Sequence, residues 1–234
     1  AQCGILQLAT GAGKTKIACS ITSRLGVKTI FFVHTHFLLN QAKNELEKVL
    51  GIKVGQIGAG IIDIQEVTVA MIQTTIKALG EEYIPSIDDE IKEEDFTDIT
   101  GKEEIIKSLL SNVDLIFFDE CQFVAAESFY TIANTCSAFY KYGLSATPYR
   151  SDKKDPMITA ALGDIIVKVS ASYLIKRGFL TQPKIHFLKN STNVQTNRKY
   201  HIVYKDDIVE NIQRNMSIVN ATKKLVLQNK STLI

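Results

Sequence analysis

The sequence predicts an α/β domain built on a doubly wound, mostly parallel β-sheet. Short apolar segments alternate with amphipathic helical segments from residue 1 to about residue 150. Some apolar segments are continuous, such as Leu115–Phe118, which suits strands buried on both faces of a parallel sheet. Between the strands, apolar residues such as Leu38, Ala42 and Leu46 recur at helical spacing, with Lys and Glu opposite them.

We expect five strands in this alternation. They are Gly4–Leu8, Thr29–Val33, Val67–Met71, Val113–Phe118 and Tyr140–Leu144. Sheets of this type bind ligands beyond the carboxyl ends of their strands, so the loops after these strands are the candidate sites.

An acidic segment, residues 81–112, interrupts the alternation. Residues 81–104 contain eleven Asp or Glu against two Lys, in a chain whose formal net charge is +2. We expect a surface insertion with a weak helix at Glu103–Leu110. The rest of the chain is basic, which is compatible with a phosphate-backbone partner and is also typical of a solvated surface.

Beyond residue 150 the pattern predicts a helix ending at Leu174–Gly178, a connector, a strand at Lys184–Leu188 and a long helix. The apolar stripe of that last helix consists of Ile208, Ile212, Met216 and Val219. We expect residues 1–180 to form one domain and residues 181–234 to begin another. The first strand starts close to residue 1 and Ser231–Ile234 resembles a strand just starting, so we expect a chain cut at both ends.

Composition excludes several classes of protein. With 234 residues, 45% of them apolar, the chain can bury a large core. No apolar run reaches the roughly 18 residues of a membrane span, and no signal peptide is visible, so we expect a cytoplasmic protein without a membrane partner. The four cysteines and four histidines lack metal-ligand spacing, which favours reduced, buried thiols.

A glycine-bearing loop follows the first expected strand and precedes a helix. Gly11 and Gly13 let the backbone curl, Lys14 can reach the phosphates of a nucleotide, and the Thr15 hydroxyl can bind Mg²⁺. The candidate phosphate-binding residues are Thr10, Gly11, Ala12, Gly13, Lys14 and Thr15. The full G-x-x-x-x-G-K-[ST] pattern is not met, because Leu8 replaces its first glycine. An ordinary turn with a surface lysine is the alternative.

Two acids end the apolar strand that contains Leu115–Phe118. Asp119 is placed to hold the Mg²⁺ shared with Thr15, and Glu120 to orient and deprotonate an attacking water. The alternative is a loop that begins with two solvated acids. A polar loop, Gly143–Pro148, follows the next expected strand.

Five segments in this order carry a family resemblance. Ala9–Thr15, Asp119–Gln122 and Ser145–Thr147 resemble motifs I, II and III of superfamily 2 helicases and translocases. Val33–Gln41 and Val69–Thr74 are similar to motif Ia and to the family's next nucleic-acid-contacting segment. The branch with type III restriction subunits, phage recombination helicases and nucleotide-excision-repair helicases is the most similar.

The resemblance implies a RecA-like P-loop NTPase domain that uses ATP and Mg²⁺ and acts on nucleic acid, with DNA favoured over RNA. The tail from Leu180 resembles the crossover into a second RecA-like domain, which would be the domain's partner. It also implies that Lys14, Asp119 and Glu120 are catalytic and that Gln122, Ser145 and Thr147 belong to the nucleotide site. The implied nucleic-acid contacts are Thr35, Gln73 and Thr74.

The chain departs from the family pattern at two positions. His34 stands where many relatives have proline, and Gln122 where they have His or Asp. Since an amide both donates and accepts, Gln122 can still link to Ser145 or Thr147. Motifs IV to VI are absent from these residues, so we expect this chain to bind ATP·Mg²⁺ weakly and to hydrolyse very little.

Three functions lead at this point, and a non-helicase P-loop enzyme is disfavoured mainly by Ser145–Thr147 and by the order of the weaker motifs. The first is the first motor domain of an ATP-dependent DNA helicase. The second is a motor that translocates on duplex DNA without unwinding it, in a restriction or remodelling complex. The third is a nucleic-acid binding module with a vestigial ATP site, against which the intact Lys14, Thr15, Asp119 and Glu120 argue.

Overall fold

The structure is a computed structural model that describes residues 2–82, 99–122, 126–148, 155–185, 187 and 199–232. The chain divides into two compact units, Ala1–Thr181 and Gln182–Ile234. Each unit is described by itself below.

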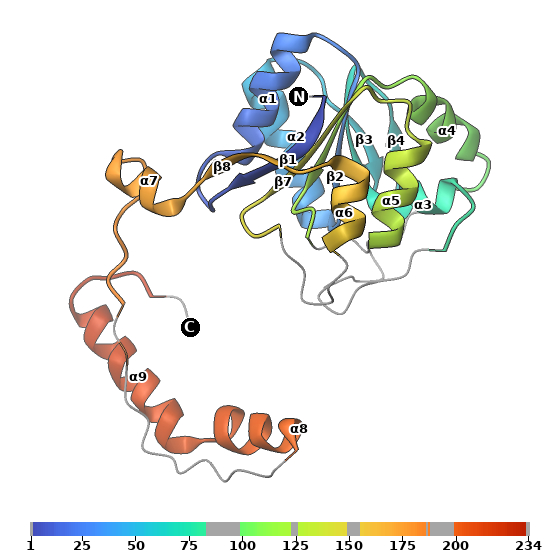
Figure 1. Cartoon of the computed structure of the whole chain (residues 1–234). Coiled ribbons are helices and arrows are strands. Elements are labelled where there is room, and N and C mark those ends of the chain that lie inside the picture. The colour runs from blue at the N-terminus through green and yellow to red at the C-terminus, as the bar shows by residue number, and fades with distance from the viewer. Residues whose placement is uncertain are drawn as a thin grey trace. The chain divides into compact units, whose positions relative to one another are not determined.

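The first unit is built on one sheet that has eight strands in the described residues (Figure 1). The strands are β1 (Cys3–Leu8), β2 (Thr29–Val33), β3 (Gly55–Gly58), β4 (Ile61–Asp63), β5 (Val67–Met71), β6 (Leu115–Asp119), β7 (Tyr140–Ser145) and β8 (Ile165–Val169). Their order across the sheet is β4-β3-β5-β2-β6-β7-β1-β8. Only the β3–β4 pair is antiparallel among these described strands, so the expected mostly parallel sheet is confirmed.

All five expected strands form, with small shifts at their ends. The strand expected to begin at Val113 begins at Leu115 and includes Asp119. The sequence analysis missed β3, β4 and β8. The first two are only four and three residues long, and β8 is an edge strand whose central residues are exposed, so none shows a buried apolar run.

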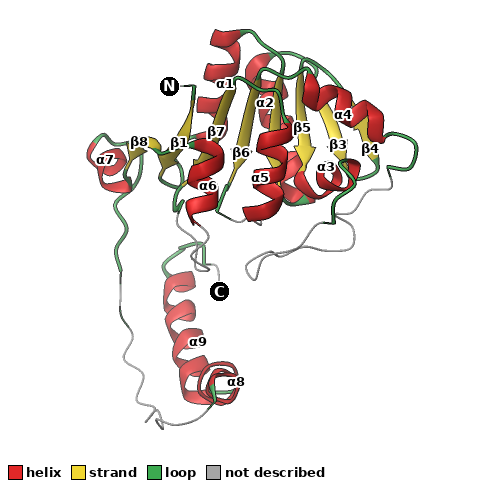
Figure 2. Cartoon of the chain, turned by 45° about the vertical axis from the view of Figure 1, so that its right-hand side comes forward, coloured by secondary structure: helices red, strands yellow, loops and turns green. Residues whose placement is uncertain are grey.

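Helices cover both faces of the sheet (Figure 2). They are α1 (Lys14–Leu25), α2 (His36–Leu50), α3 (Ile72–Ala78), α4 (Glu103–Ser111), α5 (Ala126–Thr135) and α6 (Asp155–Leu162). Alternate residues of β2 point to opposite faces: Phe31 packs with α1 and α2, and Phe32 packs with α3 to α6. Both rings are fully buried, which explains the continuous apolar run of this strand.

The acidic segment is not simply a surface insertion. Its residues 83–98 lie outside the described residues, but Ile99 is 2% exposed and α4 buries Ile106, Leu109 and Leu110 in the core. The expected helix is therefore part of the layer that covers the sheet. The acidic character of the segment comes in part from the first turn of this amphipathic helix, where Glu104 is exposed.

The helix expected before the connector is α7 (Ala171–Lys176), which still belongs to the first unit. In the second unit, the strand expected at Lys184–Leu188 does not form in the residues that the structure describes. Lys184, Ile185 and Phe187 have no regular structure, and the other two residues of the segment lie outside the described residues.

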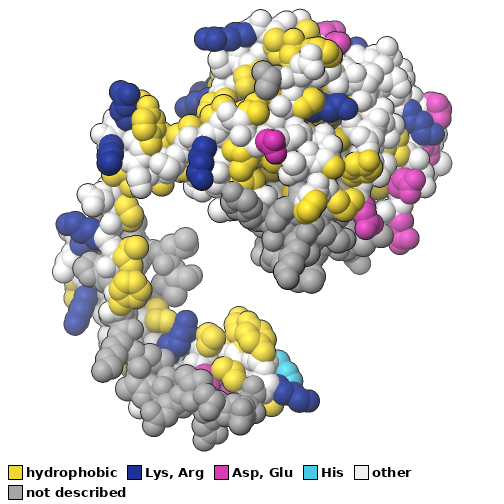
Figure 3. All heavy atoms as spheres, viewed as in Figure 1, with side chains coloured by type: hydrophobic (Ala, Val, Ile, Leu, Met, Phe, Trp, Pro, Cys, Tyr) yellow, Lys and Arg dark blue, Asp and Glu magenta, His cyan; other side chains and the backbone are white. Residues whose placement is uncertain are grey.

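The second unit contains α8 (Tyr200–Val203), the π-helical turn η2 (Tyr204–Val209) and α9 (Ile212–Leu227). The expected long helix is interrupted, because Asn211 caps α9 by accepting a hydrogen bond from Arg214 N at 2.9 Å. Hydrophobic side chains lie exposed on α9, including Ile212 and Met216 (Figure 3). That this unit begins a second RecA-like domain stays a prediction. Among the described helices, none is both long and apolar enough to span a membrane.

Candidate active site

Three adjacent strands bring the candidate residues together. In the sheet order, β7 lies between β6 and β1, and all three run parallel. Their carboxyl ends therefore meet at one edge, which carries the loop after β1, Asp119 at the end of β6 and Ser145 at the end of β7. Residues more than 100 positions apart in the chain share this edge.

The loop after β1 has the backbone that phosphate binding requires. Gly11 and Gly13 have φ angles of +81° and +82°, in the left-handed region that other residues rarely adopt. Helix α1 then begins at Lys14 with Gly13 as its N-cap, so no cap side chain occupies the first N–H groups of the helix. Free N–H groups and the positive end of the helix dipole together favour an anion at this point.

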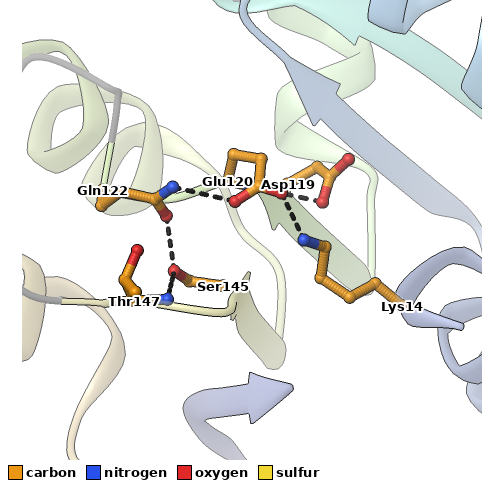
Figure 4. Close-up of polar contacts among 6 residues, drawn as sticks. All are labelled: Lys14, Asp119, Glu120, Gln122, Ser145 and Thr147. Carbon is orange, nitrogen blue, oxygen red and sulfur yellow. Dashed lines mark hydrogen bonds and ion pairs between the residues drawn. The ribbon is translucent and has the colours of Figure 1, made fainter. Parts of the chain in front are cut away.

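Lys14 and Glu120 form an ion pair across the pocket (Figure 4). The Lys14 ammonium donates to Glu120 Oε1, which joins the loop after β1 to the end of β6. Both side chains are largely shielded from water, with relative exposures of 15% and 24%. A phosphate that binds the loop would compete with Glu120 for Lys14.

Glu120 has a strained backbone. Its φ of +46° lies in the left-handed region, which costs a non-glycine residue roughly 1–2 kcal/mol. The turn brings the N–H of Glu120 within 3.1 Å of Asp119 Oδ1, as donor and acceptor. Such strain persists where the surrounding structure holds it, and it is frequent at active sites.

Asp119 is a buried carboxyl, with 8% of its surface exposed. Burial, followed by the negative charge of Glu120, raises the pKa of Asp119 to about 6. A cation beside this carboxylate would relieve both effects. Thr15 lines the same pocket, and a threonine hydroxyl with a carboxylate is an oxygen donor set of the kind Mg²⁺ prefers. These residues therefore fit Mg²⁺.

Gln122 connects the end of β6 to the end of β7. Its Nε2 donates to Glu120 Oε2 at 2.8 Å, and its Oε1 accepts from Ser145 Oγ at 2.5 Å. The N–H of Thr147 in turn donates to Ser145 Oγ at 2.9 Å. The expected link through the amide is thus present, and dashed lines in Figure 4 follow it from Glu120 through Gln122 to Ser145.

The pocket itself has a volume of about 240 Å³. Its lining residues are Gly11, Gly13, Lys14, Thr15, Leu38, Gln41, Ala42, Glu45, Asp119 and Glu120. Of the candidate phosphate-binding residues, Thr10 instead lines a neighbouring hollow with Gln7 and Ala146, and Ala12 lines neither.

Sequence reasoning missed Gln41 and Glu45 of α2. They are four residues apart, so they lie on one face of the helix, at the border of the apolar stripe that contains Ala42. This spacing beside the apolar stripe is a signal in the sequence that could have indicated a shared position for the two side chains.

The three candidate nucleic-acid contacts lie after β2 and β5, at the same edge of the sheet. Thr35 caps α2, and its Oγ1 accepts a hydrogen bond from Leu38 N at 3.3 Å. Gln73 and Thr74 are each 1% exposed, and their contact with nucleic acid stays a prediction. Gln73 Nε2 donates to the His34 carbonyl at 2.5 Å, so the amide holds the loop after β2 in place.

The cysteines carry no chemistry in this arrangement. All four are free thiols, and Cys19, Cys121 and Cys136 are buried, as expected. Burial, together with the charges of Glu120 and Asp119, raises the pKa of the Cys121 thiol to about 12. Cys121 therefore stays protonated at neutral pH and is no nucleophile.

Comparison with known proteins agrees with this geometry. Residues 1–150 match the family described as type III restriction enzyme, res subunit. The DNA 3'-5' translocase XPB2 of Sulfurisphaera tokodaii is 27% identical over 200 residues, which are 84% of this chain and 38% of that protein. The chain thus spans well under half the length of this relative.

Solved structures share the fold. The UvsW helicase of bacteriophage T4 superposes with a TM-score of 0.51 at 20% identity, over 71% of this chain and 54% of that chain. The type ISP restriction-modification enzyme LlaGI, solved with a DNA substrate mimic, gives 0.51 at 14% identity, over 76% of this chain and 19% of that chain. The first unit therefore shares the α/β fold of these solved structures.

Proposed function

Because this chain belongs to the family of type III restriction enzyme res subunits, we propose that it is the first motor domain of an ATP-dependent DNA helicase. In this proposal the pocket between the loop after β1 and the end of β6 binds ATP with Mg²⁺. Hydrolysis would be coupled to strand unwinding by closure against a second RecA-like domain of the same protein.

The ion pair between Lys14 and Glu120 is the observation that carries the proposal. It places a phosphate-binding cation and a base for water at one point, beside the buried carboxyl of Asp119. A module that had lost its ATP site would have no reason to keep a buried acid whose pKa is raised.

The residues have separate roles in the proposed reaction. Lys14 leaves Glu120 and binds the β- and γ-phosphates, while the first N–H groups of α1 hold the phosphate chain. Glu120, now released, accepts a proton from the water that attacks the γ-phosphorus, and ADP leaves from the opposite side. Thr15 and Asp119 would hold Mg²⁺, which neutralises charge on the phosphates when bound.

Gln122 and Ser145 would couple ATP binding at Glu120 to a change in the residues at the end of β7. Glu120 changes partner when ATP binds, and Gln122 is hydrogen-bonded to it. Thr35 would contact the nucleic-acid backbone at the same edge. Gln73 and Thr74 would support that loop from inside.

Binding of ATP·Mg²⁺ to the 234-residue chain tests the nucleotide site. Isothermal titration should give weak, saturable binding, and Lys14→Ala should weaken it at least about tenfold, because a charge-assisted contact to phosphate is lost. Lys16→Ala is the matched control, since Lys16 is an exposed residue of the same helical turn and should bind normally. Equal affinities of the two variants for ATP·Mg²⁺ would contradict the proposed nucleotide site.

The motor role is tested on a protein that contains both RecA-like domains. We expect it to displace one strand of a partial DNA duplex with ATP, and Glu120→Gln to stop this while ATP still binds. The isolated chain should hydrolyse almost no ATP. Robust DNA-stimulated hydrolysis by the isolated chain would contradict the assignment as half of a motor.

Translocation on duplex DNA without unwinding is the second candidate. The name of the Sulfurisphaera tokodaii relative, a DNA 3'-5' translocase, favours it. Displacement of a third strand from a DNA triplex, without displacement of a strand from a duplex, would identify this activity.

A further inference from the structure

Glu45 lines the same pocket as the loop after β1, although none of the family motifs quoted above includes it. It belongs to α2, which Ala42 and Leu46 anchor in the core on either side of it. Within the described residues its carboxylate makes no hydrogen bond or ion pair. The carboxylate is therefore held at the pocket by its helix and not by a polar partner.

The described lining of the pocket has an excess of negative charge. Glu45, Asp119 and Glu120 contribute three carboxylates, against the single ammonium of Lys14. Lys14 is already neutralised by Glu120. The charge of Glu45 reaches its neighbours: after burial and Glu120, it adds to the rise in the pKa of Asp119, and after burial it raises the pKa of the Cys19 thiol.

This excess of negative charge acts differently on free ATP and on ATP that carries a divalent cation. Free ATP is a polyanion and is repelled by every unpaired carboxylate of the pocket. A divalent cation on the phosphates lowers that charge, and it also gives Asp119 a partner. Repulsion within a partly enclosed pocket is several times stronger than in bulk water, because the effective dielectric constant is lower.

We propose that Glu45 determines which form of nucleotide the pocket accepts: its carboxylate disfavours free ATP and so makes binding depend on a divalent cation. This inference rests on the proposed function, because it concerns the same nucleotide site. Glu45 suits the role better than Asp119 or Glu120, since it has no expected contact with Mg²⁺ or with the attacking water.

The test compares the dissociation constants of ATP in MgCl₂ and in EDTA, by titration calorimetry on the whole chain. Glu45→Gln keeps the size and helix propensity of the side chain and removes its charge. We expect Glu45→Gln to tighten binding in EDTA by about tenfold and to leave binding in MgCl₂ within about twofold. Raising the salt concentration should tighten EDTA binding of the unmodified chain more than that of Glu45→Gln, because salt screens the repulsion.

Glu66→Gln is the matched control, because Glu66 is exposed beside the first residue of β5, at the opposite edge of the sheet. It changes net charge equally and should leave both constants unchanged. An equal gain for Glu66→Gln, no gain for Glu45→Gln, or a loss for Glu45→Gln only in MgCl₂ would each overturn the inference. If the unmodified chain binds ATP·Mg²⁺ and Lys14→Ala does not, the proposed nucleotide site is supported even when the Glu45→Gln result contradicts the role of Glu45.

Discussion

Ser145 donates a hydrogen bond to Gln122 over 2.5 Å, although 23 residues separate them in the chain. The bond joins the ends of β7 and β6, and Gln122 continues it to Glu120 at 2.8 Å. A side chain with both a donor and an acceptor is needed at the middle position. This explains how Gln122 can stand where relatives of the family have His or Asp.

Ser145→Ala should destabilise the first unit by about 0.5–1.5 kcal/mol, because Gln122 Oε1 and the N–H of Thr147 both lose a hydrogen bond to the buried Ser145 hydroxyl. Urea unfolding followed by circular dichroism measures the change. Ser111→Ala, on the exposed end of α4, is the control and should change the free energy by less than about 0.5 kcal/mol. Equal losses of unfolding free energy in the two variants would mean that the hydrogen bonds of Ser145 add nothing to stability.

Asp119→Asn should stabilise the protein at pH 7.5 and not at pH 4. The folded-state pKa, about 6, lies above the ordinary value of 3.8, so the folded chain binds this proton more tightly than the unfolded chain. The group therefore costs no stability below about pH 4, and the cost grows as pH rises through about 6, to about 3 kcal/mol.

Urea unfolding of Asp119→Asn and of the unmodified chain at the two pH values measures this difference. Asp114→Asn, an exposed position just before the same strand, should change little at either pH. A variant at Asp119 that is less stable at pH 7.5 than the unmodified chain would contradict the burial argument.

Gly11→Ala should lower both stability and nucleotide affinity. A Cβ at this position would lie 2.8 Å from Leu180 Cδ2, and the φ of +81° is strained for any other residue. Gly26→Ala has comparable strain, with φ +62°, but its Cβ meets no atom within 4 Å. The loss of stability at Gly11 should exceed that at Gly26 only slightly, because the end of the half-buried Leu180 side chain can shift, and adding Leu180→Ala should remove this excess. Thermal unfolding of the unmodified chain, Gly11→Ala, Gly26→Ala and the double variant Gly11→Ala with Leu180→Ala measures these losses of stability.

Ile106→Ala should cost about 2–5 kcal/mol, the usual price of a cavity in a core. Ile105→Ala, at the neighbouring residue of α4, should cost little, because Ile105 is 51% exposed and Ile106 only 1%. Denaturant unfolding of both variants gives the comparison. Similar small losses would mean that α4 is a dispensable surface element after all.

The sequence by itself determined the parts of this protein that depend on short segments. Glycines that adopt positive φ, a lysine at the start of a helix and two acids after an apolar strand are local features, so the glycine-bearing loop after β1 and the position of Asp119 and Glu120 at the end of β6 could be predicted. The five central strands could be predicted for the same reason, since burial on both faces leaves continuous apolar runs.

Only the tertiary structure decided which polar residues reach the pocket. The polar side of α2 is typical of a solvated surface, but in the fold the exposed Gln41 and the half-buried Glu45 also line the pocket beside Lys14 and Asp119. Packing likewise encloses Gln73 and Thr74 and draws α4 into the core. The direction of a side chain depends on how its element lies on the sheet, and residues distant in sequence set that arrangement.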